Sequence, residues 1–125
     1  MPDLTFDHEH HIYRLNGVVM PSVTQVISAA GLSNYDHVPA DVLQAACEFG
    51  ANVHKACEYS DKWSLDLASL DPALAPYLSA WVKFLSDYSA EVVEIEAPLY
   101  SPKYKFCGTP DRIAYIGGRL FVIDI

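Results

Sequence analysis

Apolar residues recur at helical spacing through the middle of the chain and alternate toward both of its ends. Two long helices are predicted, one over residues 39–59 and one that begins at Asp71-Pro72 or Ala75-Pro76 and ends at about Tyr88. Proline suits the first turn of a helix, which supports these starting points. The stripe that we expect the first long helix to bury consists of Val42, Ala46, Phe49, Val53 and Ala56.

Ahead of these helices the pattern is mixed. Residues 4–19 alternate around an Asn16-Gly17 turn and therefore predict a β-hairpin. A short helix follows, with Ser22 and Gln25 as a capping box and Gly31 as the glycine that ends it.

The last third of the chain predicts an antiparallel meander of three strands, near residues 92–100, 110–116 and 119–125, with residues 100–107 as a connection. In the first strand, Glu94 and Glu96 fall on one face, and Val93 and Ile95 fall on the other. Helices followed by a meander predict an α+β (or α/β) fold, in which a helical N-terminal half packs on an antiparallel sheet.

The strongest local signal is the dipeptide Gly117-Gly118, which is typical of a two-residue hairpin loop. Such a loop fixes the register, so that Ile116 faces Arg119 and, further along, Asp111 faces Asp124. Directly opposed residues hold their Cβ atoms about 4.5–5.5 Å apart, and like charges there destabilise a sheet. Alternation also places both aspartates on one otherwise apolar face of the hairpin.

Two interpretations of this acidic pair are open. Asp111 and Asp124 are either solvated residues at strand ends, since Asp is a common turn former, or ligands of a cation. A bulged loop would also slip the register and separate them. In favour of the cation, burial and mutual repulsion both oppose ionisation, and Mg²⁺ or Mn²⁺ with oxygen ligands would relieve both.

His54 lies on the first long helix, four residues after Gly50. A glycine inside a helix costs about 1 kcal/mol relative to alanine, and a helical side chain leans over the preceding turn. Gly50 is therefore interpreted as giving room to the imidazole, to another backbone or to an ion. The alternative is a core histidine bonded to a carbonyl. Glu58 lies one turn further, where it either shares the site of His54 or pairs with Lys55 or Lys62, and the pairing is the expected outcome.

The chain has 125 residues, enough for one small domain, and carries a net charge of −8. It ends at Ile125 in an apolar strand, so we expect a single domain, residues 1–125, that is truncated at its C-terminus. An acidic surface repels phosphate backbones and, taken alone, argues against a nucleic-acid partner. A signal peptide and an apolar run of membrane-spanning length are not evident, so we expect a soluble cytoplasmic protein of a bacterial or phage-infected cell, without a membrane partner.

Three cysteines, Cys47, Cys57 and Cys107, are too widely spaced for a zinc knuckle or a disulfide framework. Reduced thiols are the expected state. An iron–sulfur protein is an alternative, in which only Cys47 and Cys57 could meet.

Taken together, these residues resemble the pattern of the PD-(D/E)XK nuclease superfamily, and most closely its RecB-type branch of phage and helicase-associated exonucleases. Pro110-Asp111 and Asp124-Ile125 match the motif that names the superfamily, which has a lysine at the next position. Residues 50–54 match the G-x-x-x-H element of the upstream helix. Residues 21–24 and 107–113 also resemble phage members, so the likeness spans nearly the whole chain.

The resemblance implies a partial restriction-endonuclease-like fold and a set of site residues. His54, Asp111 and Asp124 are the implied ligands of Mg²⁺ or Mn²⁺, and the carbonyl of Ile125 is another. Glu96 is implied as a further catalytic carboxylate, in the outer shell or at a second ion. With such ions bound, the expected chemistry is attack of an activated water on a phosphodiester.

The implied function is metal-dependent DNA hydrolysis, as an exonuclease in phage recombination or repair, with DNA and an oligomer or a helicase as partners. Because the motif lysine is not among the 125 residues, we expect this chain to bind a divalent ion without cleaving DNA. The alternative is a non-catalytic, nuclease-like module that serves as a scaffold in a helicase–nuclease or phage complex. The joint presence of His54, Asp111 and Asp124 favours the nuclease.

Overall fold

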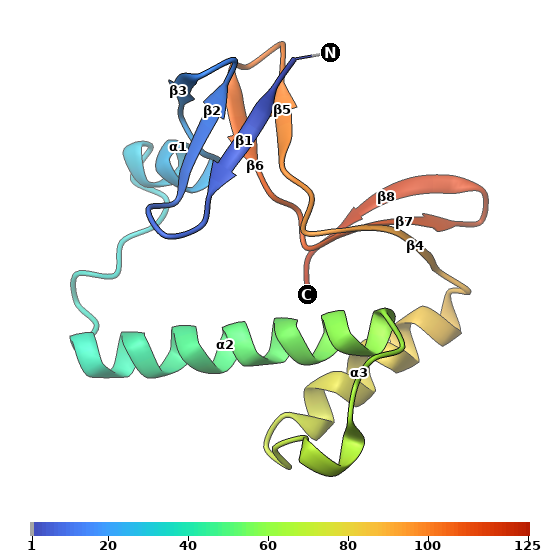
Figure 1. Cartoon of the computed structure of the whole chain (residues 1–125). Coiled ribbons are helices and arrows are strands. Elements are labelled where there is room, and N and C mark those ends of the chain that lie inside the picture. Colours follow the sequence, from blue (N-terminus) through green and yellow to red (C-terminus); the bar gives the residue numbers. More distant parts are fainter. Residues whose placement is uncertain (1) are drawn as a thin grey trace. The chain divides into compact units, whose positions relative to one another are not determined.

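A computed structural model describes residues 2–125 and has the predicted α+β fold (Figure 1). The strands are β1 (Leu4–Asp7), β2 (Ile12–Leu15), β3 (Val18–Met20), β4 (Glu91–Ile95), β5 (Leu99–Ser101), β6 (Phe106–Gly108), β7 (Arg112–Ile116) and β8 (Arg119–Ile123). The helices are α1 (Val23–Ala29), α2 (Ala40–Asp61) and α3 (Ala75–Asp87), with a 3-10 turn over Leu67–Ser69. No helix in this described part is long and apolar enough to cross a membrane.

By their internal contacts the residues form two compact units, and each is described by itself. The first unit comprises Met1–His37 and Glu96–Pro110, and the second comprises Val38–Ile95 and Asp111–Ile125. That the whole chain forms a single domain remains a prediction.

In the first unit, β1, β2 and β3 form an antiparallel sheet in that order. Asn16 and Gly17 join β2 to β3 with φ angles of 50° and 81°, as a two-residue hairpin turn requires. The predicted hairpin is therefore confirmed, and β1 adds a third strand to it. Before α1, the Ser22 hydroxyl accepts the N–H of Gln25 and the Gln25 side chain accepts the N–H of Ser22, so the predicted capping box is also confirmed.

The prediction of a plain connection over residues 100–107 is wrong, because β5 and β6 pair there as an antiparallel hairpin. Its turn is closed by the N–H of Lys105, which donates to the Ser101 carbonyl at 2.8 Å. Lys105 itself takes the left-handed conformation, with a φ of 59°. A residue other than glycine is uncommon in that conformation, so nothing in the sequence marked this turn.

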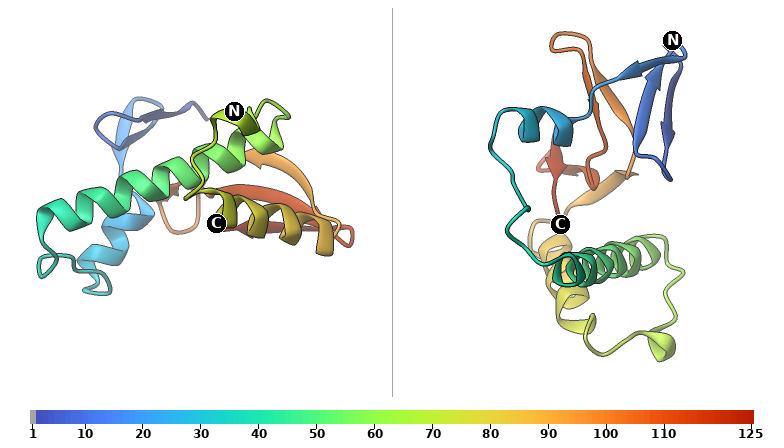
Figure 2. Two further views of the ribbon diagram at one scale, coloured as in Figure 1. Left: turned by 90° about the horizontal axis from the view of Figure 1, so that it is seen from below. Right: turned by 90° about the vertical axis from the view of Figure 1, so that its left-hand side faces the viewer.

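In the second unit, α2 and α3 pack against each other and against one face of a sheet with the order β4-β7-β8 (Figure 2). Both helices lie where the apolar spacing predicts them. The buried core consists of Val53, Cys57, Leu78 and Trp81, with Val92, Ile123 and Ile125 among the residues packed on it from the sheet side. These contacts fix the C-terminal half of α2 relative to the end of β8.

Only the C-terminal half of the predicted stripe on α2 is buried. Val53 and Ala56 are 8% and 5% exposed, whereas Val42 and Phe49 are 55% and 37% exposed. The apolar spacing therefore identified the correct helix but overestimated how much of it the core covers.

The pairing of β7 with β8 has the predicted register, from Ile116 opposite Arg119 to Arg112 opposite Ile123. The two loop glycines, at positions 117 and 118, have φ angles of 58° and 77°, the left-handed values of a type I′ turn. Asp111 and Asp124 therefore flank the last pair at the same end of the hairpin.

The first strand of the meander is shorter than predicted and carries a bulge. β4 stops at Ile95, and its register with β7 slips at Val93. Consequently Val93 is 47% exposed while Val92 packs on the core. The prediction that Glu94 and Glu96 share one face of a strand is wrong, because Glu96 lies beyond the strand with a φ of 47°.

The buried face of the β7–β8 hairpin is also not the predicted one. Arg112 and Ala114 are both 0% exposed. The opposite face, which we expected to be buried around the aspartates, is open to solvent, and Tyr115, Leu120 and Val122 are 45%, 57% and 69% exposed. The apolar side chains predicted burial of the face that carries Tyr115, Leu120 and Val122, and this prediction is wrong because the buried face is the one that carries Arg112.

Candidate metal centre

Asp111 and Asp124 lie next to each other at the open end of the β7–β8 hairpin. Asp111 Oδ2 accepts a hydrogen bond from the backbone N–H of Ile125 at 2.7 Å, which ties the two chain segments together beyond the last strand pair. The carboxylate of Asp111 is thereby held in one orientation beside Asp124.

The carboxyl group of Asp111 changes the electrostatic environment of Asp124. A hydrogen bond with Asp111 raises the pKa of Asp124 above its ordinary value, and burial and the negative charge of Asp111 raise it further, while His54 opposes the rise. The negative charge of Asp111 disfavours ionisation of Asp124, and a cation with oxygen ligands would relieve that repulsion.

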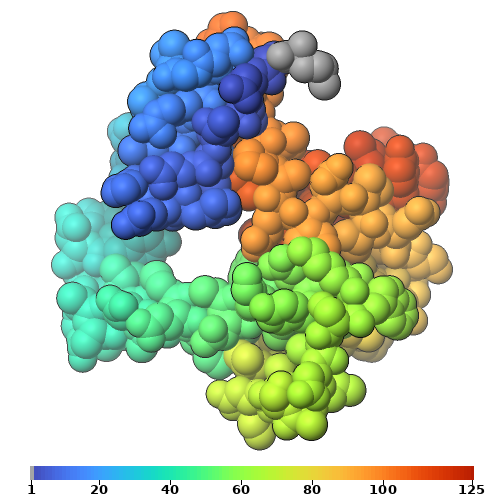
Figure 3. All heavy atoms as spheres, in the orientation of Figure 1, coloured from blue at the N-terminus to red at the C-terminus, as the bar shows by residue number. Residues whose placement is uncertain are grey.

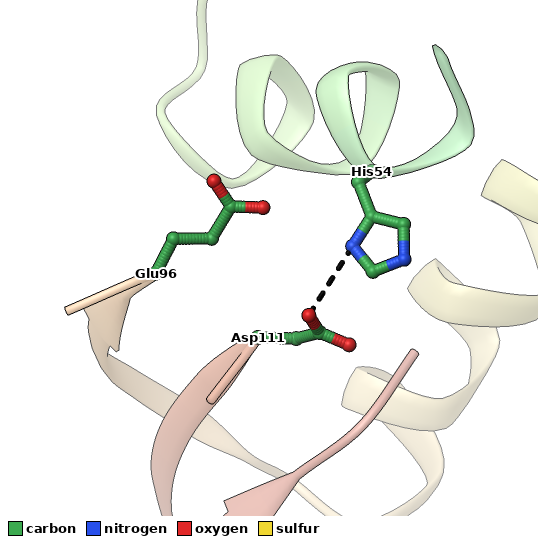
Figure 4. A group of neighbouring side chains, drawn as sticks. All are labelled: His54, Glu96 and Asp111. Carbon is green, nitrogen blue, oxygen red and sulfur yellow. Dashed lines mark ion pairs between the residues drawn. The ribbon is translucent and has the colours of Figure 1, made fainter. Parts of the chain in front are cut away.

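His54, from α2, points toward Asp111 (Figure 4). Its Nδ1 lies 3.4 Å from Asp111 Oδ1, and the two side chains are 28% and 15% exposed. Val53 and Cys57, on either side of it in α2, are core residues, so the helix presents the imidazole from a fixed position. The histidine and one of the aspartates are thus brought together as the sequence pattern predicts.

Gly50 does not have the role that its position suggested. A Cβ placed on Gly50 would meet no other atom within 4 Å, so no side chain or backbone approaches too closely for an alanine. The interpretation that this glycine makes room for the imidazole or for another backbone is therefore wrong, whereas room for an ion stays a prediction.

The side chain of Arg112 binds the backbone of Asp111. The buried guanidinium of Arg112 donates from Nη1 to the Asp111 carbonyl at 2.7 Å and from Nε to Asp61 at 2.8 Å. Asp61, at the end of α2, also accepts the indole N–H of Trp81 at 2.9 Å, and the guanidinium lies 5.5 Å from the centre of the Trp81 ring. This group of three side chains joins α2, α3 and the start of β7.

Sequence reasoning missed this supporting group. The only signal was an arginine within an otherwise apolar hairpin, and its partner Asp61 lies 51 residues earlier. Arg112 Nη2 is the one buried side-chain N or O atom in residues 2–125 that has no hydrogen-bond partner.

Beside the site, the second unit has an open pocket of about 510 Å³. It is mainly apolar and aromatic, and His54 and Asp124 contribute its polar part. It is lined by Phe49, Gly50, Val53, His54, Tyr77, Ala80, Trp81, Phe84, Ile123, Asp124 and Ile125. The candidate ligands therefore border a concave surface, where binding sites are commonly found.

The remaining residues that the sequence indicated are placed as follows. Ile125, whose carbonyl is an implied ligand, is the residue whose N–H binds Asp111. Glu96, also labelled in Figure 4, is the residue directly after Ile95, which pairs with Arg112 across β4 and β7. Glu58 pairs with Lys62 at 2.7 Å and with Lys55 at 3.9 Å, as expected, and its bond with Lys62 lowers its pKa.

The three cysteines are free thiols. Cys47 and Cys57 lie ten residues apart in the continuous helix α2, a separation of about 15 Å along the axis at the usual rise per residue. The suggestion that these two could meet at an iron–sulfur cluster is therefore wrong.

Comparisons with known proteins do not assign this chain to a family. Scanning against family models gives no match, and searches of curated proteins and of solved structures give no significant similarity.

Proposed function

We propose that the second unit carries a divalent-metal centre and that its function is metal-dependent hydrolysis of DNA, as an exonuclease or endonuclease in phage recombination or repair. The observation that carries this proposal is the approach of His54, from a helix, to within 3.4 Å of Asp111, whose hydrogen bond with Asp124 raises the pKa of Asp124. The likeness to the PD-(D/E)XK pattern suggests the reaction.

The donor set fits Mg²⁺ or Mn²⁺. Carboxylate oxygens are the ligands that both ions favour, and an imidazole nitrogen is acceptable to Mn²⁺. A cation held by Asp111 and Asp124 would compete with the proton whose binding to Asp124 is favoured by the raised pKa of that group. The negative charge of Asp111 and Asp124 would therefore stabilise a cation bound beside them.

When bound, such an ion would supply a water activated for attack and would stabilise the charge that develops on the leaving oxygen. Asp111 and Asp124 would supply the negative charge that binds it, and His54 an uncharged donor. The Ile125 N–H and the Arg112 guanidinium orient Asp111 from its other sides. Glu96, which the likeness implies for the outer shell or a second ion, belongs to the first unit, and its role stays a prediction.

Calorimetric titration with Mn²⁺ tests the centre directly. We expect the 125-residue chain to bind Mn²⁺ weakly, and each of Asp111→Asn, Asp124→Asn and His54→Ala to lower the affinity by at least about tenfold. Asp111→Asn keeps an oxygen that can accept the Ile125 N–H, so its effect reports charge rather than folding. Asp36→Asn, in an exposed loop, is the matched control and should bind as the wild type does.

Equal Mn²⁺ binding by the wild type and all three variants would refute the proposed metal centre.

Cleavage of linear duplex DNA with Mg²⁺ or Mn²⁺ provides the second readout. We expect little turnover from these 125 residues, since the lysine of the motif is not among them, and robust turnover would refute that expectation. Mn²⁺ binding distinguishes the nuclease from a scaffold, which has no use for the ion.

A further inference from the structure

The hairpin of β5 and β6, in the first unit, carries a concentration of positive charge that is unusual for this chain. Residues 97–110 include Lys103 and Lys105 and no acidic residue, within a chain whose net charge is −8. Lys103, Tyr104 and Lys105 are consecutive and all exposed at the turn. Figure 3 shows atoms of this orange segment next to the blue strands of the same unit.

These two lysines differ from the other lysines of the chain in their partners. Lys55, Lys62 and Lys83 each form an ion pair with a carboxylate on their own helix or at its end. Among residues 2–125, Lys103 and Lys105 have no carboxylate partner. Their ammonium groups lie instead over tyrosine rings, at 4.8 Å from the centre of Tyr104 and 5.9 Å from the centre of Tyr100.

The turn that presents these lysines is held by its own hydrogen bonds. The N–H of Tyr104 donates to Ser101 Oγ at 3.2 Å, and the N–H of Lys105 donates to the Ser101 carbonyl at 2.8 Å. Tyr104 is 64% exposed and stacks on Phe106 at an interplanar angle of 16°. The charges therefore stand on an ordered turn, which lowers the entropy lost when a ligand binds.

The base of the hairpin is anchored in the first unit. Cys107 is fully buried and donates its N–H to the Pro21 carbonyl at 2.8 Å. Two residues later, Thr109 Oγ1 lies 2.6 Å from the hydroxyl of the buried Tyr13. The turn is thus the exposed end of an element whose other end is fixed.

We propose that the turn of residues 102–105 binds the phosphate backbone of DNA. This inference rests on the proposed function, and it names the element that holds the substrate. Lys103 and Lys105 pair with phosphates, and the hydroxyl of Tyr104 donates a hydrogen bond to a phosphate or sugar oxygen between them. Such contacts read no bases, so the binding is independent of sequence.

Fluorescence anisotropy with a short labelled DNA duplex in EDTA, over a series of salt concentrations, measures this contact without the metal centre. Each phosphate neutralised contributes about 0.9 to the slope of log K against log salt concentration. The Lys103→Gln/Lys105→Gln variant should therefore lose about 1.8 from that slope and bind more weakly at every salt concentration. The Lys103→Arg/Lys105→Arg variant should keep the salt slope and the DNA affinity of the wild type, because it keeps both positive charges.

Lys62→Gln/Lys83→Gln is the matched control, since it removes the same charge from lysines that already have carboxylate partners. Its slope should equal that of the wild type. Equal losses in the two glutamine variants, or an unchanged slope in the hairpin variant, would overturn the proposal. Circular dichroism melting curves should be the same for all variants, because the substituted side chains are exposed.

Failure of this proposal is distinguishable from failure of the metal centre. A wild-type chain that binds Mn²⁺ through His54, Asp111 and Asp124 but shows no affinity for DNA would refute the hairpin contact alone. DNA binding that depends on Lys103 and Lys105, in a chain that does not bind Mn²⁺, would refute the metal centre alone.

Discussion

At the scale of single residues, Arg112 has the most demanding environment in the second unit. Its guanidinium has no exposed surface. It donates hydrogen bonds to Asp61 and to the Asp111 carbonyl, and it lies over the Trp81 ring. Moving a charge out of water costs several kcal/mol, which only good partners offset. The place of Asp111, and with it the candidate metal centre, depends on this arrangement.

Replacing Arg112 by methionine should destabilise the second unit by about 3–5 kcal/mol, because Asp61 would stay buried without its cation. Urea unfolding measures this loss. The double variant Arg112→Met/Asp61→Asn should be more stable than Arg112→Met alone, since it removes the unpaired charge as well. Lys83→Met, which breaks an exposed ion pair on α3, should change little. An Arg112→Met chain with the urea midpoint of the wild type would contradict this account.

Asp124 makes the metal-free protein sensitive to pH. Its pKa is raised in the folded chain, chiefly by the hydrogen bond with Asp111. For a group with a raised pKa, the contribution to stability is complete below the ordinary pKa and is lost as pH rises through the raised one. We therefore expect Mn²⁺ to raise the melting temperature more at neutral pH than at acidic pH, where protons compete for the carboxylates.

Melting curves with and without Mn²⁺ over a series of pH values measure this difference. In Asp111→Asn the pH dependence should be weaker, because the hydrogen bond and the negative charge that raise the Asp124 pKa are both altered. A shift by Mn²⁺ that is the same at every pH would show that the ion does not replace a proton here.

At the scale of elements, α2 contains one position, Gly50, at which a substitution is expected to stabilise the helix. Gly50 is inside a helix and has no neighbour that a methyl group would meet. Gly50→Ala should therefore stabilise the chain by about 1 kcal/mol, visible as a higher melting temperature, with Mn²⁺ affinity unchanged. Ala51→Gly, at the exposed neighbouring position, should have the opposite effect of similar size. A less stable Gly50→Ala chain would restore the idea that the glycine allows a close approach.

Elements with a local chemical signal were predictable from the sequence. Gly117-Gly118 set the register of β7 and β8, and Ser22 with Gln25 marked the start of α1. The hairpin of β5 and β6 was missed because its turn uses Lys105, and not a glycine, in the left-handed conformation. The bulge at Val93 was missed because a slip in pairing depends on the partner strand.

At the scale of the whole molecule, the unpredicted features are contacts between distant parts of the chain. Which face of the β7–β8 hairpin is buried follows from the pairing of Arg112 with Asp61, and no periodicity within the hairpin contains that information. The approach of His54 to Asp111 was expected from a likeness of pattern and not from spacing alone. Local signals identified most of the helices and strands, whereas the facing of the β7–β8 hairpin depends on the long-range pair of Arg112 and Asp61.

The bond between Arg112 and Asp61 also bears on the order in which the second unit forms. Helix α2 and the β7–β8 ribbon are local structures that nucleate quickly, whereas closing the 51-residue loop between these two side chains carries an entropic cost before any gain. Once made, the bond penalises partial opening, because a detached ribbon would leave a bare charge on each side. We therefore expect the backbone amides of β7 and of the last turn of α2 to exchange with solvent together, as one cooperative block.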